Sequence, residues 1–172
     1  RGSKRITAIA NASMHSAAYW LGSAAHEMWV TPTGRAGSIG VFAAHVDVSG
    51  LEQQMGVKTT LVAAGKYKVE GNPFEPLADE ARARLQNEVD GYYDMFLGDV
   101  ARNRGVSRSA VRGGYGQGRS LGAEEAKSAG LVDRVGTFTQ VMEKLSGMTG
   151  APPSQRAVNE RVLKLAEAEN SA

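Results

Sequence analysis

The sequence has 172 residues, enough for one domain with a buried core, and its 42% hydrophobic and 22% charged content is typical of globular proteins. Twenty basic and eighteen acidic side chains leave a net charge of +2, which gives no support for a nucleic acid or an anionic membrane as partner. The absence of cysteine excludes disulfides, thiolate catalysis and cysteine-based zinc sites, and we expect neither a metal nor a cofactor.

The first half of the chain alternates between two kinds of short apolar run. Runs rich in branched or aromatic residues predict strands, and the run that begins at Val57 is the clearest of them. Small apolar residues around Tyr19 and Trp20 predict a buried helix, and a second run with helical spacing ends at Gly56. The expected strands are residues 6–10, 28–30, 38–42 and 57–63, and the expected helices are residues 17–25 and 46–55.

The second half of the chain is predicted to be helical. Apolar residues recur every three or four positions from Leu77 to Val100, between Pro76 and Gly105, so one long amphipathic helix is expected there. Alternating strands and helices predict an α/β fold with mainly parallel strands. We expect three further helices at residues 107–111, 123–129 and 138–145, one domain over residues 1–146, and a linker with a charged helical tail over residues 147–172.

Ser16 is a candidate nucleophile because it stands at a predicted strand-to-helix junction before two alanines. A serine there lies beside backbone N–H groups that have no partner within the helix and that could hold an oxyanion. A capping serine needs the same position, so the local sequence leaves both interpretations open.

A nucleophilic serine needs a base, and two residue types could supply it. His15 is adjacent to Ser16 in sequence, so its side chain would point away from the serine. No obvious orienting acid stands near His26 or His45, although Asp47 is close to His45. Lysine acts as a base when burial lowers its pKa, and Lys66 and Lys68 follow the clearest predicted strand. The pattern alone does not choose between these two lysines.

Four motifs follow one another along the chain. They are Ser16-Ala17-Ala18-Tyr19, Gly37-Ser38-Ile39-Gly40-Val41, Gly65-Lys66-Tyr67-Lys68-Val69-Glu70-Gly71-Asn72-Pro73, and Gly122-Ala123-Glu124-Glu125-Ala126 with Gly130-Leu131-Val132-Asp133. In this order and spacing they resemble the signal-peptide peptidase A family of serine proteases, and its phage head-protease branch in particular. The likeness runs from about residue 6 to residue 145.

The resemblance implies a Clp-protease/crotonase-like fold and a Ser–Lys dyad. It implies that Ser16 is the nucleophile and Lys68 the general base, that Ser38 orients the lysine, and that the backbone N–H of Ala17 is one oxyanion donor. Ser13 is kept as a minor alternative nucleophile, because Ser13-Met14 is faintly similar to the Clp nucleophile motif.

The family also has upstream elements, including a glycine loop that supplies a second oxyanion donor, and no such loop precedes Ile6. We therefore expect this chain to be the C-terminal portion of the family domain and to have weak activity or none alone, because loss of one oxyanion donor costs about 10²–10³ in rate.

The resemblance implies a polypeptide substrate and a homo-oligomer, with capsid or scaffold proteins as partners. No apolar run approaches the roughly 18 residues that span a bilayer, and we expect a cytoplasmic protein, or a membrane-associated one if it is a bacterial signal-peptide peptidase.

Three other functions stay open. A non-catalytic assembly module would keep the fold for oligomerisation alone. A crotonase-like acyl-CoA enzyme would carry no buried lysine opposite Ser16. The patch Tyr115-Gly116-Gln117-Gly118 is a weak match to a nucleotide-binding loop.

Overall fold

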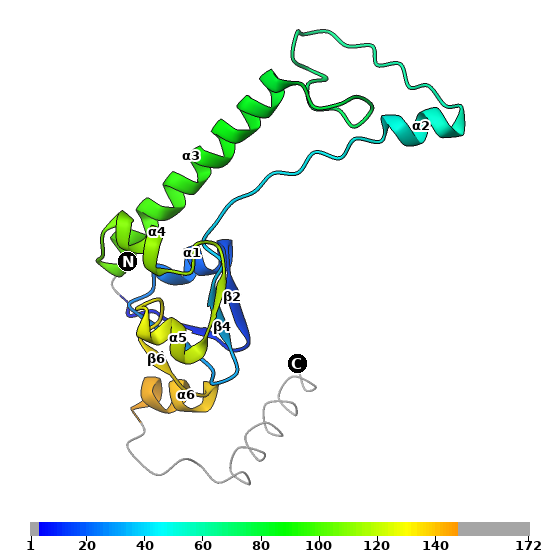
Figure 1. The fold of residues 1–172 in the computed structure, drawn as a ribbon. Coiled ribbons are helices and arrows are strands. Elements are labelled where there is room, and N and C mark those ends of the chain that lie inside the picture. Colours follow the sequence, from blue (N-terminus) through cyan, green and yellow to red (C-terminus); the bar gives the residue numbers. More distant parts are fainter. Residues whose placement is uncertain (1–3, 148–172) are drawn as a thin grey trace.

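The computed structural model describes residues 4–147, so the predicted linker and charged tail after residue 147 lie outside the described residues. Two small sheets and their helices form a body, from which a long helix and an arm project (Figure 1). The described helices are α1 (Ala17–Ser23), α2 (Ser49–Met55), α3 (Asp79–Arg104), α4 (Arg108–Gly114), α5 (Ala123–Ser128) and α6 (Phe138–Ser146).

The first sheet is parallel and consists of β1 (Thr7–Ala10), β3 (Glu27–Val30) and β6 (Arg134–Val135), in the order β1-β3-β6. The second sheet has the order β2-β4-β5. In it β2 (Ser13–His15) runs parallel to β4 (Arg35–Gly37), and β5 (Ser120–Gly122) runs antiparallel to β4. The mixed α/β class with mainly parallel strands is therefore confirmed, whereas the Clp/crotonase-like assignment stays a prediction.

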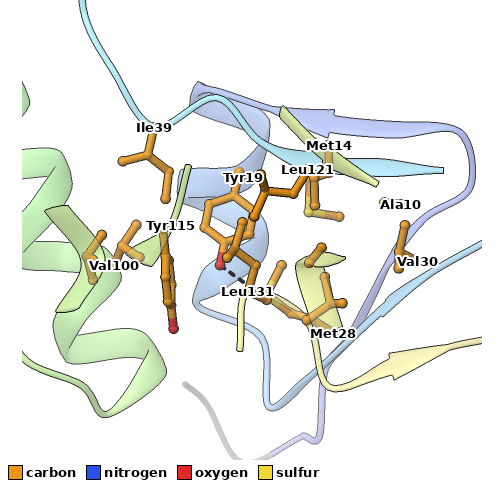
Figure 2. Close-up of a cluster of buried hydrophobic side chains, with 14 of the residues drawn as sticks. Ala10, Met14, Tyr19, Met28, Val30, Ile39, Val100, Tyr115, Leu121 and Leu131 are labelled. Carbon is orange, nitrogen blue, oxygen red and sulfur yellow. Dashed lines mark hydrogen bonds between the residues drawn. The ribbon is translucent and has the colours of Figure 1, made fainter. Parts of the chain in front are cut away.

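The core lies between the two sheets, α1 and the C-terminal half of α3. All four residues of β3 are buried, as expected for a central parallel strand. Figure 2 shows Tyr19 of α1 among side chains that come from both sheets and from the segment before β6. The largest fully buried side chains are Tyr19, Phe96, Met28, Ile39 and Leu97.

Two predicted strands are wrong. Residues 38–42 and 57–63 form no strand, although the second was the clearest prediction. Within the described part of the chain neither segment pairs with a neighbouring strand, and a strand is defined by its ladder partner. The strands β2, β4, β5 and β6 were missed, because each is only two or three residues long and too short to show periodicity.

The arm consists of residues 38–78 and carries α2 at its far end (Figure 1). The segment of the arm before α2 contacts the segment that leads toward α3 at two places. His45 Nε2 lies 2.9 Å from the carbonyl oxygen of Asn72, and the N–H of Val48 donates to Pro73 O at 2.8 Å. Of the sixteen large hydrophobic side chains exposed in the described residues, eight lie in the arm, so this arm has no core of its own. They are Phe42, Val46, Leu51, Met55, Val57, Leu61, Val62 and Tyr67.

Candidate active site

Ser16 lies between the end of β2 and the first residue of α1, at the strand-to-helix junction that the sequence predicts. Its backbone has φ 51° and ψ −123°, a combination that normally requires glycine, and its side chain makes no capping hydrogen bond. The residue is exposed. Ser16 is therefore a strained, accessible serine on a sharp strand-to-helix turn, the kind of position at which hydrolases present a nucleophile.

Hydrogen bonds on both sides keep Ser16 in this conformation. Its N–H donates to Gly37 O at 2.9 Å, and its own carbonyl accepts from the N–H of Trp20 at 2.9 Å. The Trp20 ring stacks on Phe96 of α3 with 4.5 Å between centroids, and its indole N–H donates to Asp99 at 2.8 Å. The first turn of α1 is thus attached to the second sheet and to α3.

Ser38 lies beside Ser16 because β2 and β4 are parallel and in register. His15 pairs with Gly37, so the serine that follows each residue stands at the carboxyl end of its strand, where sites in parallel sheets gather. Ser38 also has a positive φ, 54°, and its N–H donates to Arg119 O at 2.9 Å.

Ala17 is the first residue of α1 and is exposed. The N–H at the first position of a helix has no carbonyl partner within that helix. This is the placement expected of the oxyanion donor.

Lys68 does not lie with the two serines. It is exposed, in the arm loop that leads toward α3, and its N–H donates to Gly65 O at 3.2 Å. Two residues later Glu70 pairs with Arg84 at 3.8 Å, whereas α1 meets α3 at Phe96. These two points are about 18 Å apart along the helix at about 1.5 Å per residue.

The alternatives to Lys68 have other contacts. Lys66 lies over the Tyr67 ring, 4.6 Å from its centroid. His26 Nδ1 accepts from the N–H of Ile6 at 3.0 Å, and His45 contacts the Asn72 carbonyl, so both histidines hold loop backbone. His15 Nε2 is buried with no partner among residues 4–147.

Within the glycine-rich patch, Gly116, Gln117 and Gly118 form the turn that supports Ser38. Gly116, Gln117 and Gly118 all have positive φ, and a Cβ at Gly116 would lie 2.9 Å from Arg119 O, the carbonyl that accepts from Ser38. The patch connects α4 to β5, a helix to a strand, which is the reverse of the strand-to-helix context of a nucleotide loop.

The Gly130–Asp133 segment, which sequence reasoning used only as a matching motif, is a structural anchor. Asp133 accepts from the N–H of Met28 at 2.7 Å and pairs with Arg104 at 2.6 Å. Burial of Asp133 opposes its ionisation, but the hydrogen bonds from Arg104 and Met28 outweigh burial and hold the pKa of this carboxyl below its usual range. A short Gly-x-x-Asp stretch carries no signal of such a role.

In the described part of the chain, none of the helices is long and apolar enough to cross a membrane. Over the same residues, no group of three or more histidine or acidic side chains is arranged to hold a metal ion.

The chain belongs to peptidase family S49, whose sequence pattern matches residues 1–151. It is 36% identical over 142 residues to the capsid assembly protease C of Escherichia phage lambda, which covers 83% of this chain and 32% of that protein. It is 42% identical over 113 residues to the head-tail preconnector protein GP5 of Enterobacteria phage P21, covering 66% of this chain and 23% of that protein.

A putative signal peptide peptidase SppA of Enterococcus faecium is 28% identical over 130 residues, or 76% of this chain and 38% of that protein. The chain thus spans between 23% and 38% of the length of these relatives. Membership of the predicted family and the likeness to its phage branch are confirmed.

Proposed function

We propose that this chain carries the catalytic serine of a Ser–Lys endopeptidase. The neutral amine of Lys68 takes the proton of the Ser16 hydroxyl as its oxygen attacks the scissile carbonyl, and the N–H of Ala17 donates to the resulting oxyanion. When the tetrahedral intermediate breaks down, the peptide C–N bond is cleaved and the proton passes to the departing amine. The acyl-enzyme that remains is then hydrolysed by water. Ser38 would hold the lysine amine in place.

The strained backbone of Ser16 is the observation that carries this proposal. A capping or surface serine has no need of φ 51°, and such strain persists at sites where it serves a function. The second strained serine, Ser38, follows the neighbouring strand at the matching position. A merely structural α/β domain would need neither.

We infer that Lys68 reaches Ser16 from a neighbouring copy of the chain. Within one copy the arm that carries Lys68 lies at the far end of α3 from α1 (Figure 1), and Lys68 is exposed, whereas a general-base lysine must be withdrawn from water. The arm that carries Lys68 has exposed apolar side chains, including Phe42 and Val62 at 88% and 94% exposure. Exposed apolar surface and unpaired extended segments favour association with another chain.

The names of the phage relatives suggest the substrate class. A capsid assembly protease and a head-tail preconnector protein are among them, which supports capsid or head proteins, polypeptides rather than nucleic acids, as substrates and partners. A role in head maturation of a phage or prophage follows from the same argument.

Labelling with a fluorophosphonate probe tests the dyad. The full-length protein should be labelled at Ser16, and Ser16→Ala and Lys68→Ala should each abolish labelling and peptide cleavage. Lys66→Ala is the matched control, because this exposed lysine stands two positions away, and it should retain both. Unchanged labelling of Ser16→Ala would refute the assignment.

Co-expression of the two inactive variants tests the sharing of sites between copies. Ser16→Ala chains and Lys68→Ala chains with tags of different size should together regain labelling, and only on the Lys68→Ala chains. If the dyad forms within a single copy, the mixture stays unlabelled while a wild-type control is labelled.

A non-catalytic assembly module is the second candidate, favoured by the exposed arm alone. It predicts stable oligomers in which no serine reacts with the probe. Labelling of Ser16 in the assembled protein would exclude it.

A further inference from the structure

We propose that Tyr19 is a positioning residue for Ser16: its buried hydroxyl ties the first turn of α1 to the Gly130–Asp133 segment and so holds the serine in its reactive conformation. This inference rests on the proposed function, because it assigns Tyr19 a role in the reaction of Ser16.

The tie is a single well-formed hydrogen bond. Tyr19 follows Ser16 by three residues, is completely buried, and donates its hydroxyl to Leu131 O at 2.8 Å, the dashed line in Figure 2. Burial raises the pKa of Tyr19, so its hydroxyl stays a donor across the physiological pH range. Phenylalanine would fill the same space without this bond.

The segment that contains the accepting carbonyl is itself held in place by hydrogen bonds. Leu131 donates its own N–H to Ala126 O at 2.8 Å, and Asp133 exchanges two hydrogen bonds with Met28 of the central strand β3, at 2.7 and 2.8 Å. Arg104 of α3 donates to Gly130 O at 3.1 Å and to Asp133. The carbonyl that accepts from Tyr19 therefore belongs to a segment bound to α3, α5 and the first sheet.

Ser16 requires such a support because its backbone conformation is intrinsically unfavourable. A strained residue keeps its geometry only where the surroundings over-determine it. The second sheet holds Ser16 through Gly37, and α3 holds the turn through Trp20, but neither reaches the first sheet. Tyr19 supplies that third attachment on the same helical turn as the reacting hydroxyl and the Ala17 N–H.

The test compares Tyr19→Phe with Tyr115→Phe in the full-length protein. Tyr115 is a matched control: it is also buried, and its hydroxyl donates to Gly130 O at 3.1 Å, in the same segment, but it lies at the end of α4 and not on α1. Tyr19→Phe should slow labelling of Ser16 and lower kcat by about tenfold with KM unchanged, since small misplacements of a nucleophile are costly. Tyr115→Phe should stay within about twofold of wild type, as expected of a residue outside the reacting geometry.

Rescue separates positioning from loss of fold. Tyr19→4-aminophenylalanine restores a donor at the same place and should recover most of the labelling rate, even if Tyr19→Phe folds poorly. Wild-type labelling by Tyr19→Phe, equal slowing by both phenylalanine variants, or no rescue would overturn the proposal. Ser16→Ala, run in parallel, reports on the proposed function alone: if it is still labelled, the dyad assignment fails whatever Tyr19 does.

Discussion

Replacing Ser16 with glycine should abolish the reaction and at the same time stabilise the fold. Its φ of 51° and ψ of −123° match the first central position of a type II′ turn, which favours glycine. Strain at such a residue costs on the order of 1–3 kcal/mol. The greater freedom of glycine in the unfolded chain costs about 0.5–1 kcal/mol. The net gain in unfolding free energy should therefore be about 1 kcal/mol.

Urea unfolding of wild type, Ser16→Gly and Ser16→Ala, at one protein concentration, measures this gain. Ser16→Ala removes the hydroxyl but keeps the Cβ, so it should lie within about 0.5 kcal/mol of wild type. Ser16→Gly should unfold about 2–4 °C higher in a thermal scan. If Ser16→Gly is no more stable than Ser16→Ala, the inference that Ser16 stores backbone strain is wrong.

Three more outcomes test the fold and the arm. Gly136→Ala should lower the unfolding free energy by about 1–3 kcal/mol, because the new Cβ would lie 2.5 Å from the buried indole ring of Trp29. The control Gly50→Ala places its Cβ in open space within α2, and should be neutral or up to about 1 kcal/mol stabilising. The pKa of Asp133 is lower in the folded chain than in the unfolded chain, where it is about 4. The stabilisation by this carboxylate should therefore be complete above about pH 4 and be lost as the pH falls through the pKa of the folded chain. Asp133→Asn should flatten that decline in unfolding curves measured from about pH 2 to 6. Val62→Asp in the arm should shift sedimentation toward smaller species. Met142 is an exposed apolar residue of α6, and Met142→Asp should leave sedimentation unchanged. Equal effects of the two substitutions would contradict association through the arm.

Helices, which satisfy their backbone hydrogen bonds internally, were predicted well. The apolar spacing that begins at Leu77, with Gly105 as its end, predicted α3 to within two residues, and the small residues after Ser16 predicted α1. Strands were predicted less well, because a run such as residues 57–63 has strand composition whether or not a partner lies beside it. The long-range tie from Tyr19 to Leu131, 112 positions away, has no local signature at all.

The sequence by itself predicted that Ser16 stands where a strand passes into a helix, because small residues followed by a helical run are a local pattern. It also determined the family, through the order of four short motifs. Only the tertiary structure decided that Ser38 lies beside Ser16, since that depends on the register of β2 against β4. The separation of the arm that carries Lys68 from the body that carries both serines was likewise invisible in the sequence, because it follows from the position of the arm at the far end of α3 from α1 (Figure 1).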